Sequence, residues 1–191
     1  METVETYIET GNDPIKGLQW IENTEYLMVC TRNTIQLWLI EDTTSEQIVL
    51  FSQLQDMVDL KVCPNHSVDK KWLVAVKTQD QVSVLSFSLS NVEILYSIPE
   101  VSAICWNGLD IITGHFNGFI IRHDHHSQNR NKQVFKPHRG AVSSILVVDS
   151  DMFSSGMDGL IKKTSLAGHS IFGEELTHMI SPQGRLVVVE Q

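Results

Sequence analysis

The chain repeats a pattern of short alternating strands about every forty residues. Four complete repeats begin near Ile15, Met57, Val101 and Ala141, and a partial fifth repeat begins near Leu176. Each complete repeat contains two apolar strand segments, a polar turn and a third strand segment. No segment shows the sustained periodicity of a capped helix. The repeat therefore predicts an all-β chain built from small antiparallel sheets.

The polar turn before the third strand aligns the repeats. The turn pairs are Arg32-Asn33, Gln79-Asp80, Asn117-Gly118 and Asp158-Gly159. The second residue of each pair is Asn, Asp or Gly, which are the residues that tolerate a positive φ. These pairs predict two-residue hairpin turns of the primed type.

The strand segments differ in character along each repeat. The segments before the turns are apolar, which is typical of strands covered on both faces: Tyr26–Thr31, Trp72–Thr78, Leu109–Phe116 and Asp151–Met157. A more polar fourth strand is expected at the solvent side of each sheet: Gln47–Ser52, Val92–Ser97, Lys132–Phe135 and His169–Phe172. A repeat of this length made of short strands is typical of β-propeller blades.

Composition limits the classes of partner and compartment. The net charge is −9, and the first 60 residues hold 11 acidic and 2 basic side chains, so nucleic acid is an unfavourable partner. The acidic region would attract a basic partner surface, or would simply solvate one edge. The three cysteines, Cys30, Cys63 and Cys105, have no framework spacing and are expected to be buried thiols. With no signal peptide or membrane-length apolar run, we expect an intracellular protein of the cytoplasm or nucleus.

The fourth repeat carries the clearest family motif. It reads H-R-G-A-V-S-S-I, followed by F-S-S-G-M-D-G-L-I-K, and resembles a WD40 repeat. In this resemblance His138 corresponds to the histidine of the family's Gly-His pair, Ser154 or Ser155 to its serine, and Asp158 to its turn aspartate. The tryptophan position is Trp38 in the first repeat, and the other repeats have Leu85, His123 and Thr164 there.

The resemblance covers residues 15–191, after an N-terminal segment of residues 1–14. It implies a WD40-like β-propeller of about four and a half blades, open or incomplete. Thr3–Ile8 is a candidate extra outer strand, and Ser181–Val189 resembles the link between the first two strands of a blade. It further implies a structural network within the blades, made of His138, Ser154, Ser155, Asp158 and Trp38, and a non-catalytic scaffold that binds proteins.

In a propeller of this kind the hairpin turn of each repeat and the loop before its first strand lie on one face. The residues expected on that face are Arg32, Gln79, Phe116, Met157, His138 and Arg139. Arginine, methionine and aromatic side chains are enriched at protein interfaces, so this set is the predicted partner-binding surface. The alternative is that Phe116 and Met157 fold back onto neighbouring blades.

Two chemical alternatives concern the histidine-rich, basic segment 115–139. Zinc could be held by histidines in this segment, but strand alternation places His123 and His125 on one face and His126 on the other. The basic residues of the loop could instead bind a phosphate group, or simply solvate an exposed loop. The blade network explains His138, the adjacent serines and Asp158 better than a catalytic triad does. We therefore expect no enzyme activity, no cofactor and no resident metal.

The number of blades shapes the functional hypothesis. A closed WD40 propeller usually needs about seven blades, more than this chain supplies. The open edges could be completed by strands from a partner protein or by a second copy. The chain could also be part of a longer protein, as a fragment without independent function. The leading hypothesis is a scaffold or adaptor subunit of a multiprotein complex.

Overall fold

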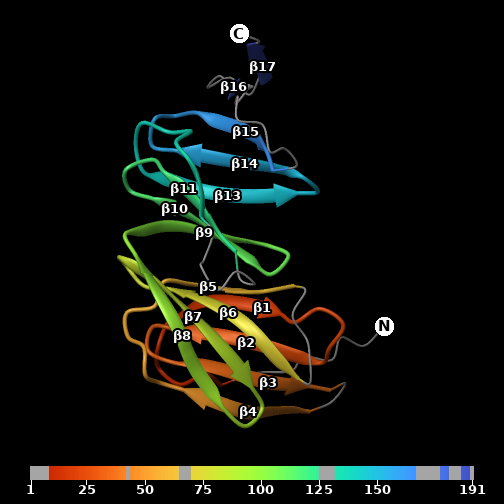
Figure 1. Ribbon diagram of the computed structural model, residues 1–191. Coiled ribbons are helices and arrows are strands. Elements are labelled where there is room, and N and C mark those ends of the chain that lie inside the picture. Colours follow the sequence, from red (N-terminus) through yellow and green to blue (C-terminus); the bar gives the residue numbers. More distant parts are fainter. Residues whose placement is uncertain are drawn as a thin grey trace. The chain divides into compact units, whose positions relative to one another are not determined.

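The computed structural model describes residues 9–41, 44–64, 70–124, 132–166, 177–180 and 186–189. In this part of the chain the secondary structure consists of strands, and no helix is present. It therefore contains no helix that could cross a membrane. The chain divides into an N-terminal half, residues 1–99, and a C-terminal half, residues 100–191. Figure 1 labels most of the strands of both halves.

The N-terminal half contains two four-stranded antiparallel sheets whose strands are in sequence order. The first sheet consists of β1 (Ile15–Trp20), β2 (Tyr26–Thr31), β3 (Ile35–Ile40) and β4 (Ser45–Phe51). The second consists of β5 (Asp59–Val62), β6 (Lys71–Lys77), β7 (Gln81–Ser88) and β8 (Val92–Pro99). Each sheet corresponds to one predicted repeat.

The C-terminal half continues the pattern with sheets of four, three and two strands. Its four-stranded sheet consists of β9 (Val101–Asn107), β10 (Asp110–His115), β11 (Ile120–His123) and β12 (Lys132–Phe135). A three-stranded sheet follows, with β13 (Val142–Val148), β14 (Asp151–Gly156) and β15 (Ile161–Ser165). A hairpin of β16 (Thr177–Ile180) and β17 (Leu186–Val189) comes last. The strands predicted at Thr3–Ile8 and His169–Phe172 lie outside the described residues.

The two halves have different cores. In the N-terminal half, apolar side chains from both sheets form one buried cluster that includes Met28, Leu37, Trp72 and Leu85. Each large apolar side chain buried in this way contributes about 1.5–3 kcal/mol to folding. The corresponding cluster of the C-terminal half is smaller and includes Ile112, Ile120, Val142 and Met152. It lies in a half that also buries His115, His123, His138, Thr113 and Ser154.

The predicted two-residue turns form in the first two repeats, but not with the predicted backbone. The amide of Thr31 donates to the carbonyl of Thr34 at 2.8 Å, and the amide of Thr78 donates to Gln81 at 2.9 Å. The prediction of a positive φ at Asn33 and Asp80 was wrong. At each turn, the hydroxyl of a threonine forms a hydrogen bond with the backbone three residues further on. The Thr31 hydroxyl accepts from the amide of Thr34 at 3.0 Å, so the turn does not depend on a left-handed residue.

In the third and fourth repeats the glycines do have a positive φ, 86° at Gly118 and 77° at Gly159. The loops are one residue longer than predicted, because they are closed by bonds from His115 to Phe119 and from Gly156 to Leu160. A type I turn followed by a left-handed residue has this length. The extra residue places Phe116 and Met157 first in their loops.

The tryptophans and cysteines follow the expectation only in part. The apolar strand segments around Trp20, Trp72 and Trp106 favour core positions for all three; Trp72 and Trp106 are buried, but Trp20 is 48% exposed. Its indole N–H donates to the carbonyl of Thr24 at 2.9 Å, which holds the ring at the surface. Cys30 and Cys63 are buried and Cys105 is half-buried, and none of the three forms a disulfide. Burial raises the pKa of the Cys30 thiol to about 12, so this group stays protonated.

Gly114 allows the two sheets of the C-terminal half to approach closely. A Cβ at this position would lie 2.6 Å from Cγ1 of Val142, which is closer than side chains pack. We predict that Gly114→Ala lowers the free energy of unfolding by about 1–3 kcal/mol, as measured by urea denaturation. The double variant with Val142→Ala should lose less than the sum of the two single variants, because the smaller side chain relieves the clash. A fully additive double variant would contradict this packing account.

Candidate protein-interaction surface

A buried polar cluster links the loop before β13 to the end of β14. Nδ1 of His138 lies 2.9 Å from Oδ1 of Asp158, and Nε2 of the same ring lies 2.9 Å from Oγ of Ser154. His138 is 1% exposed and Ser154 is 2% exposed. Ser155 points to the opposite face of the strand, where its hydroxyl lies 2.8 Å from that of Ser143. Of the two serines considered from the sequence, the structure thus brings Ser154 to His138.

Asp158 also anchors the backbone on both sides of the cluster. Its carboxylate accepts from the amide of Arg139 at 3.0 Å and from the amide of Leu160 at 3.3 Å. Burial alone would raise the pKa of Asp158, but the hydrogen bonds from Arg139, His138 and Leu160 outweigh it and lower the pKa below its usual 3.8. The carboxylate therefore remains ionised at neutral pH and keeps accepting hydrogen bonds from these donors.

A related cluster occurs in the preceding sheet. Oγ1 of Thr113 lies 3.0 Å from Nε2 of His115 and 2.9 Å from Nε2 of His123. Nδ1 of His115 faces the carbonyl oxygen of Glu100 at 3.1 Å. Burial is the main cause of a lowered pKa at His115, which favours the neutral ring. His123, at the tryptophan position of its repeat, thus contacts the strand hydroxyl through a ring nitrogen.

At the positions equivalent to Thr113 and Ser154, the N-terminal half has apolar residues instead of hydroxyl side chains. Val29 and Val76 occupy the positions of Thr113 and Ser154 relative to their turns. The indole N–H of Trp38 donates to Oε1 of Gln36, on its own strand, at 2.9 Å. The indole of Trp38 is therefore bonded within its own sheet.

The loops 116–118 and 157–159 both form hydrogen bonds with the segment that precedes β13. The amide of His138 approaches the carbonyl of Gly118 at 3.4 Å, and the amide of Met157 donates to Ala141 at 2.8 Å. A Cβ on Gly118 would lie 2.1 Å from the carbonyl oxygen of His138, so a larger residue does not fit there. Residues 116–118, 136–140 and 157–159 therefore form one continuous surface, which we call the loop-tip surface.

The loop-tip surface exposes apolar and cationic side chains together. Phe116 is 52% exposed and Met157 is 78% exposed, so neither is folded back into a core. Arg139 and Lys136 are exposed beside them. Nζ of Lys136 lies 4.8 Å from the centre of the Phe119 ring, a cation–π distance.

The remaining predicted site residues lie elsewhere. Arg32 and Gln79 are exposed at turn tips of the N-terminal half, and Arg32 forms a 2.7 Å ion pair with Asp56. His138 is buried, so it supports the surface without contacting a partner. His125 and His126 lie outside the described residues. Among the residues that the structure describes, no three His, Cys, Asp or Glu side chains are grouped to hold a metal ion.

No protein-family model and no curated protein matches this chain. Solved structures do match it. The computationally designed protein Ika4 has 16% sequence identity and a TM-score of 0.66, over 87% of this chain and 100% of Ika4. Sqt1 from Chaetomium thermophilum, bound to the N-terminus of the ribosomal protein L10, has 16% identity and a TM-score of 0.66. That match covers 91% of this chain and 58% of Sqt1.

A second Sqt1 structure has a TM-score of 0.68 and is matched over 50% of its length. The designed protein Ika8 has a TM-score of 0.64 and is matched over 60% of its length. At 15–16% identity these matches establish the fold alone. The chain is all-β and propeller-like, and an open, incomplete propeller is compatible with its sheets.

The serine assignment and the charge on Asp158 can be tested together. Ser154→Ala and Asp158→Ala should each lower the free energy of unfolding by about 1–3 kcal/mol, because each leaves buried polar groups without a partner. Ser155→Ala is the matched control and should change it by less than about 0.5 kcal/mol. Urea denaturation with near- and far-ultraviolet circular dichroism measures all three.

The effect of Asp158→Ala should also depend on pH. Because the folded-state pKa of Asp158 is lowered, its stabilising contribution is complete above the ordinary value of 3.8 and disappears as the pH falls through the folded-state value. The difference between wild type and Asp158→Ala should therefore shrink in acid. A difference that stays constant, or an equal loss in Ser155→Ala, would refute the assignment.

Proposed function

We propose that this chain is a non-catalytic, WD40-like module that binds a partner protein through the loop-tip surface. One observation carries the proposal: Phe116 and Met157 are exposed at loop tips whose neighbouring backbone is bonded to a buried polar cluster. Such a surface loses little conformational freedom when a partner binds. Exposed aromatic, methionine and arginine side chains are the types enriched at interface centres.

The charge of the surface indicates the chemistry of the partner. Arg139 and Lys136 flank the apolar tips, so an acidic segment with at least one apolar side chain would complement them. A rim of cations of this kind mainly increases the association rate and the selectivity. The apolar tips would supply most of the affinity.

The similarity to Sqt1 supports a protein segment as the class of ligand, because Sqt1 was crystallised with the N-terminus of a ribosomal protein. The contacts of His138 with Ser154 and Asp158 support the WD40-like part of the proposal. A cytoplasmic or nuclear location is part of the proposal. It is supported by three cysteines that form no disulfide.

The direct test is capture of partners from a cell lysate with the tagged full chain, with mass spectrometry and size-exclusion chromatography of the product. Phe116→Asp with Met157→Asp should abolish capture of the main partner. Leu50→Asp, the same change at an exposed position on β4, is the matched control and should leave capture unchanged.

Equal capture by wild type and the Phe116/Met157 double variant would refute the loop-tip surface as the binding site. Chromatography distinguishes the ways in which open edges could be completed. A heteromeric complex indicates strands from a partner, and a complex of this chain alone indicates a second copy.

A further inference from the structure

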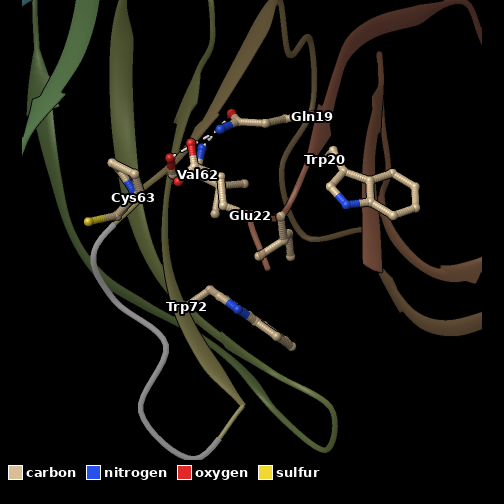
Figure 2. A pocket seen from close by; sticks show the side chains of 8 residues that line it. Gln19, Trp20, Glu22, Val62, Cys63 and Trp72 are labelled. Carbon is tan, nitrogen blue, oxygen red and sulfur yellow. Dashed lines mark hydrogen bonds between the residues drawn. The ribbon is translucent and has the colours of Figure 1, made fainter. Parts of the chain in front are cut away.

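A small cavity lies in the N-terminal half, where the end of β1 meets the end of β5 and the start of β6 (Figure 2). Its walls include Gln19, Trp20, Glu22, Val62, Cys63 and Trp72. It offers about 20 Å³ of space, enough for one water-sized group such as a carbonyl oxygen.

The cavity wall is fixed by bonds between two sheets. Oε1 of Gln19 accepts from the amide of Val62 at 2.8 Å, and Nε2 of Gln19 donates to the carbonyl of Val62 at 3.3 Å. This reciprocal pair joins β1 to β5. The Trp72 ring packs edge to face against Tyr26, with ring centres 5.5 Å apart. The site is therefore formed before any ligand binds.

Trp72 presents a buried hydrogen-bond donor that has no acceptor in the described part of the chain. The residue is 1% exposed, and Nε1 has no acceptor among the residues that the structure describes. No other buried side-chain nitrogen or oxygen in that part of the chain lacks a partner. Buried donors in native proteins are almost always paired, so an acceptor entering this cavity would complete the site.

The surroundings of the cavity select against an anionic acceptor. Glu22 is exposed and lines the cavity, and no basic side chain of the described residues forms an ion pair with it. Trp20 is half-exposed beside it, with its N–H already bonded to Thr24, which leaves the ring available to a cation. Leu18, on the same face of β1 and 63% exposed, extends the surface with an apolar side chain.

We propose that this cavity and the adjoining face of β1 bind an extended peptide segment that carries an arginine or lysine next to a neutral backbone carbonyl. The carbonyl accepts from Nε1 of Trp72, the cation lies against Trp20 and Glu22, and an apolar neighbour packs on Leu18. The acidic excess of the first 60 residues attracts such a segment. The site uses no residue of the loop-tip surface and is independent of that proposal.

The test observes the Trp72 indole N–H directly by ¹H–¹⁵N NMR of the full chain. The peptide acetyl-Val-Arg-Val-amide is titrated in, and acetyl-Val-Glu-Val-amide is the control probe. We expect the arginine peptide to shift the Trp72 indole resonance downfield and the glutamate peptide to leave it in place. Trp72→Phe keeps an aromatic ring without the donor, and it assigns the resonance.

Glu22→Gln should weaken binding of the arginine peptide about two- to fivefold, as expected for an exposed charge pair. Glu46→Gln, the same change on β4 away from the cavity, should have no effect and serves as the matched control. An unmoved indole resonance, an equal response to both peptides, or equal affinities of the two glutamate variants would each overturn the proposal.

Discussion

The carboxylate of Asp158 holds together the part of the molecule to which we assign a function. It receives hydrogen bonds from the His138 ring and from the amides of Arg139 and Leu160. His138 in turn reaches Ser154 inside the sheet. One partly exposed acceptor thus bonds to a loop tip, to the segment beside it and, through His138, to the underlying strand. Without it, the segment around Arg139 and the loop of Met157 would be less restrained, and the entropic cost of binding would rise.

The two halves use the same strand pattern with different chemistry. In the N-terminal half, the positions two residues before the turns' closing bonds are occupied by Val29 and Val76. A large apolar cluster stabilises the two sheets there. In the C-terminal half Thr113 and Ser154 occupy these positions, and histidines complete their hydrogen bonds. Apolar packing is non-directional, whereas these polar clusters bond to specific backbone groups, so they position loops more exactly. The proposed loop-tip surface lies in the C-terminal half, which contains these polar clusters.

Much of the architecture was predictable because it depends on period and alternation. The repeat starts, the strand order and the role of Gly118 and Gly159 follow from patterns within a few residues. The backbone conformation at Asn33 and Asp80 does not follow from such patterns. Each turn is bonded by the hydroxyl of the preceding threonine, Thr31 or Thr78, which lies outside the turn pair used for the prediction. The distinction between Ser154 and Ser155 depends on which strand face meets His138.

The cavity beside Trp72 could not be predicted from the sequence. An apolar strand with a tryptophan predicts a core position, which Trp72 has, but it does not reveal that the indole donor lacks an acceptor. The same pattern would place Trp20 in the core, whereas a hydrogen bond to the carbonyl of Thr24 holds its indole ring at the surface. A sequence pattern gives the polarity of a position, whereas individual hydrogen bonds depend on tertiary contacts between residues far apart in the chain.

Hydrogen–deuterium exchange of wild type and Asp158→Ala tests most directly whether the carboxylate of Asp158 holds the loop-tip surface. The account predicts faster exchange in residues 116–118, 136–140 and 157–160 of the variant, and unchanged exchange in β6 and β7. Unchanged exchange at those three segments would contradict it. So would an increase spread evenly over both halves of the chain.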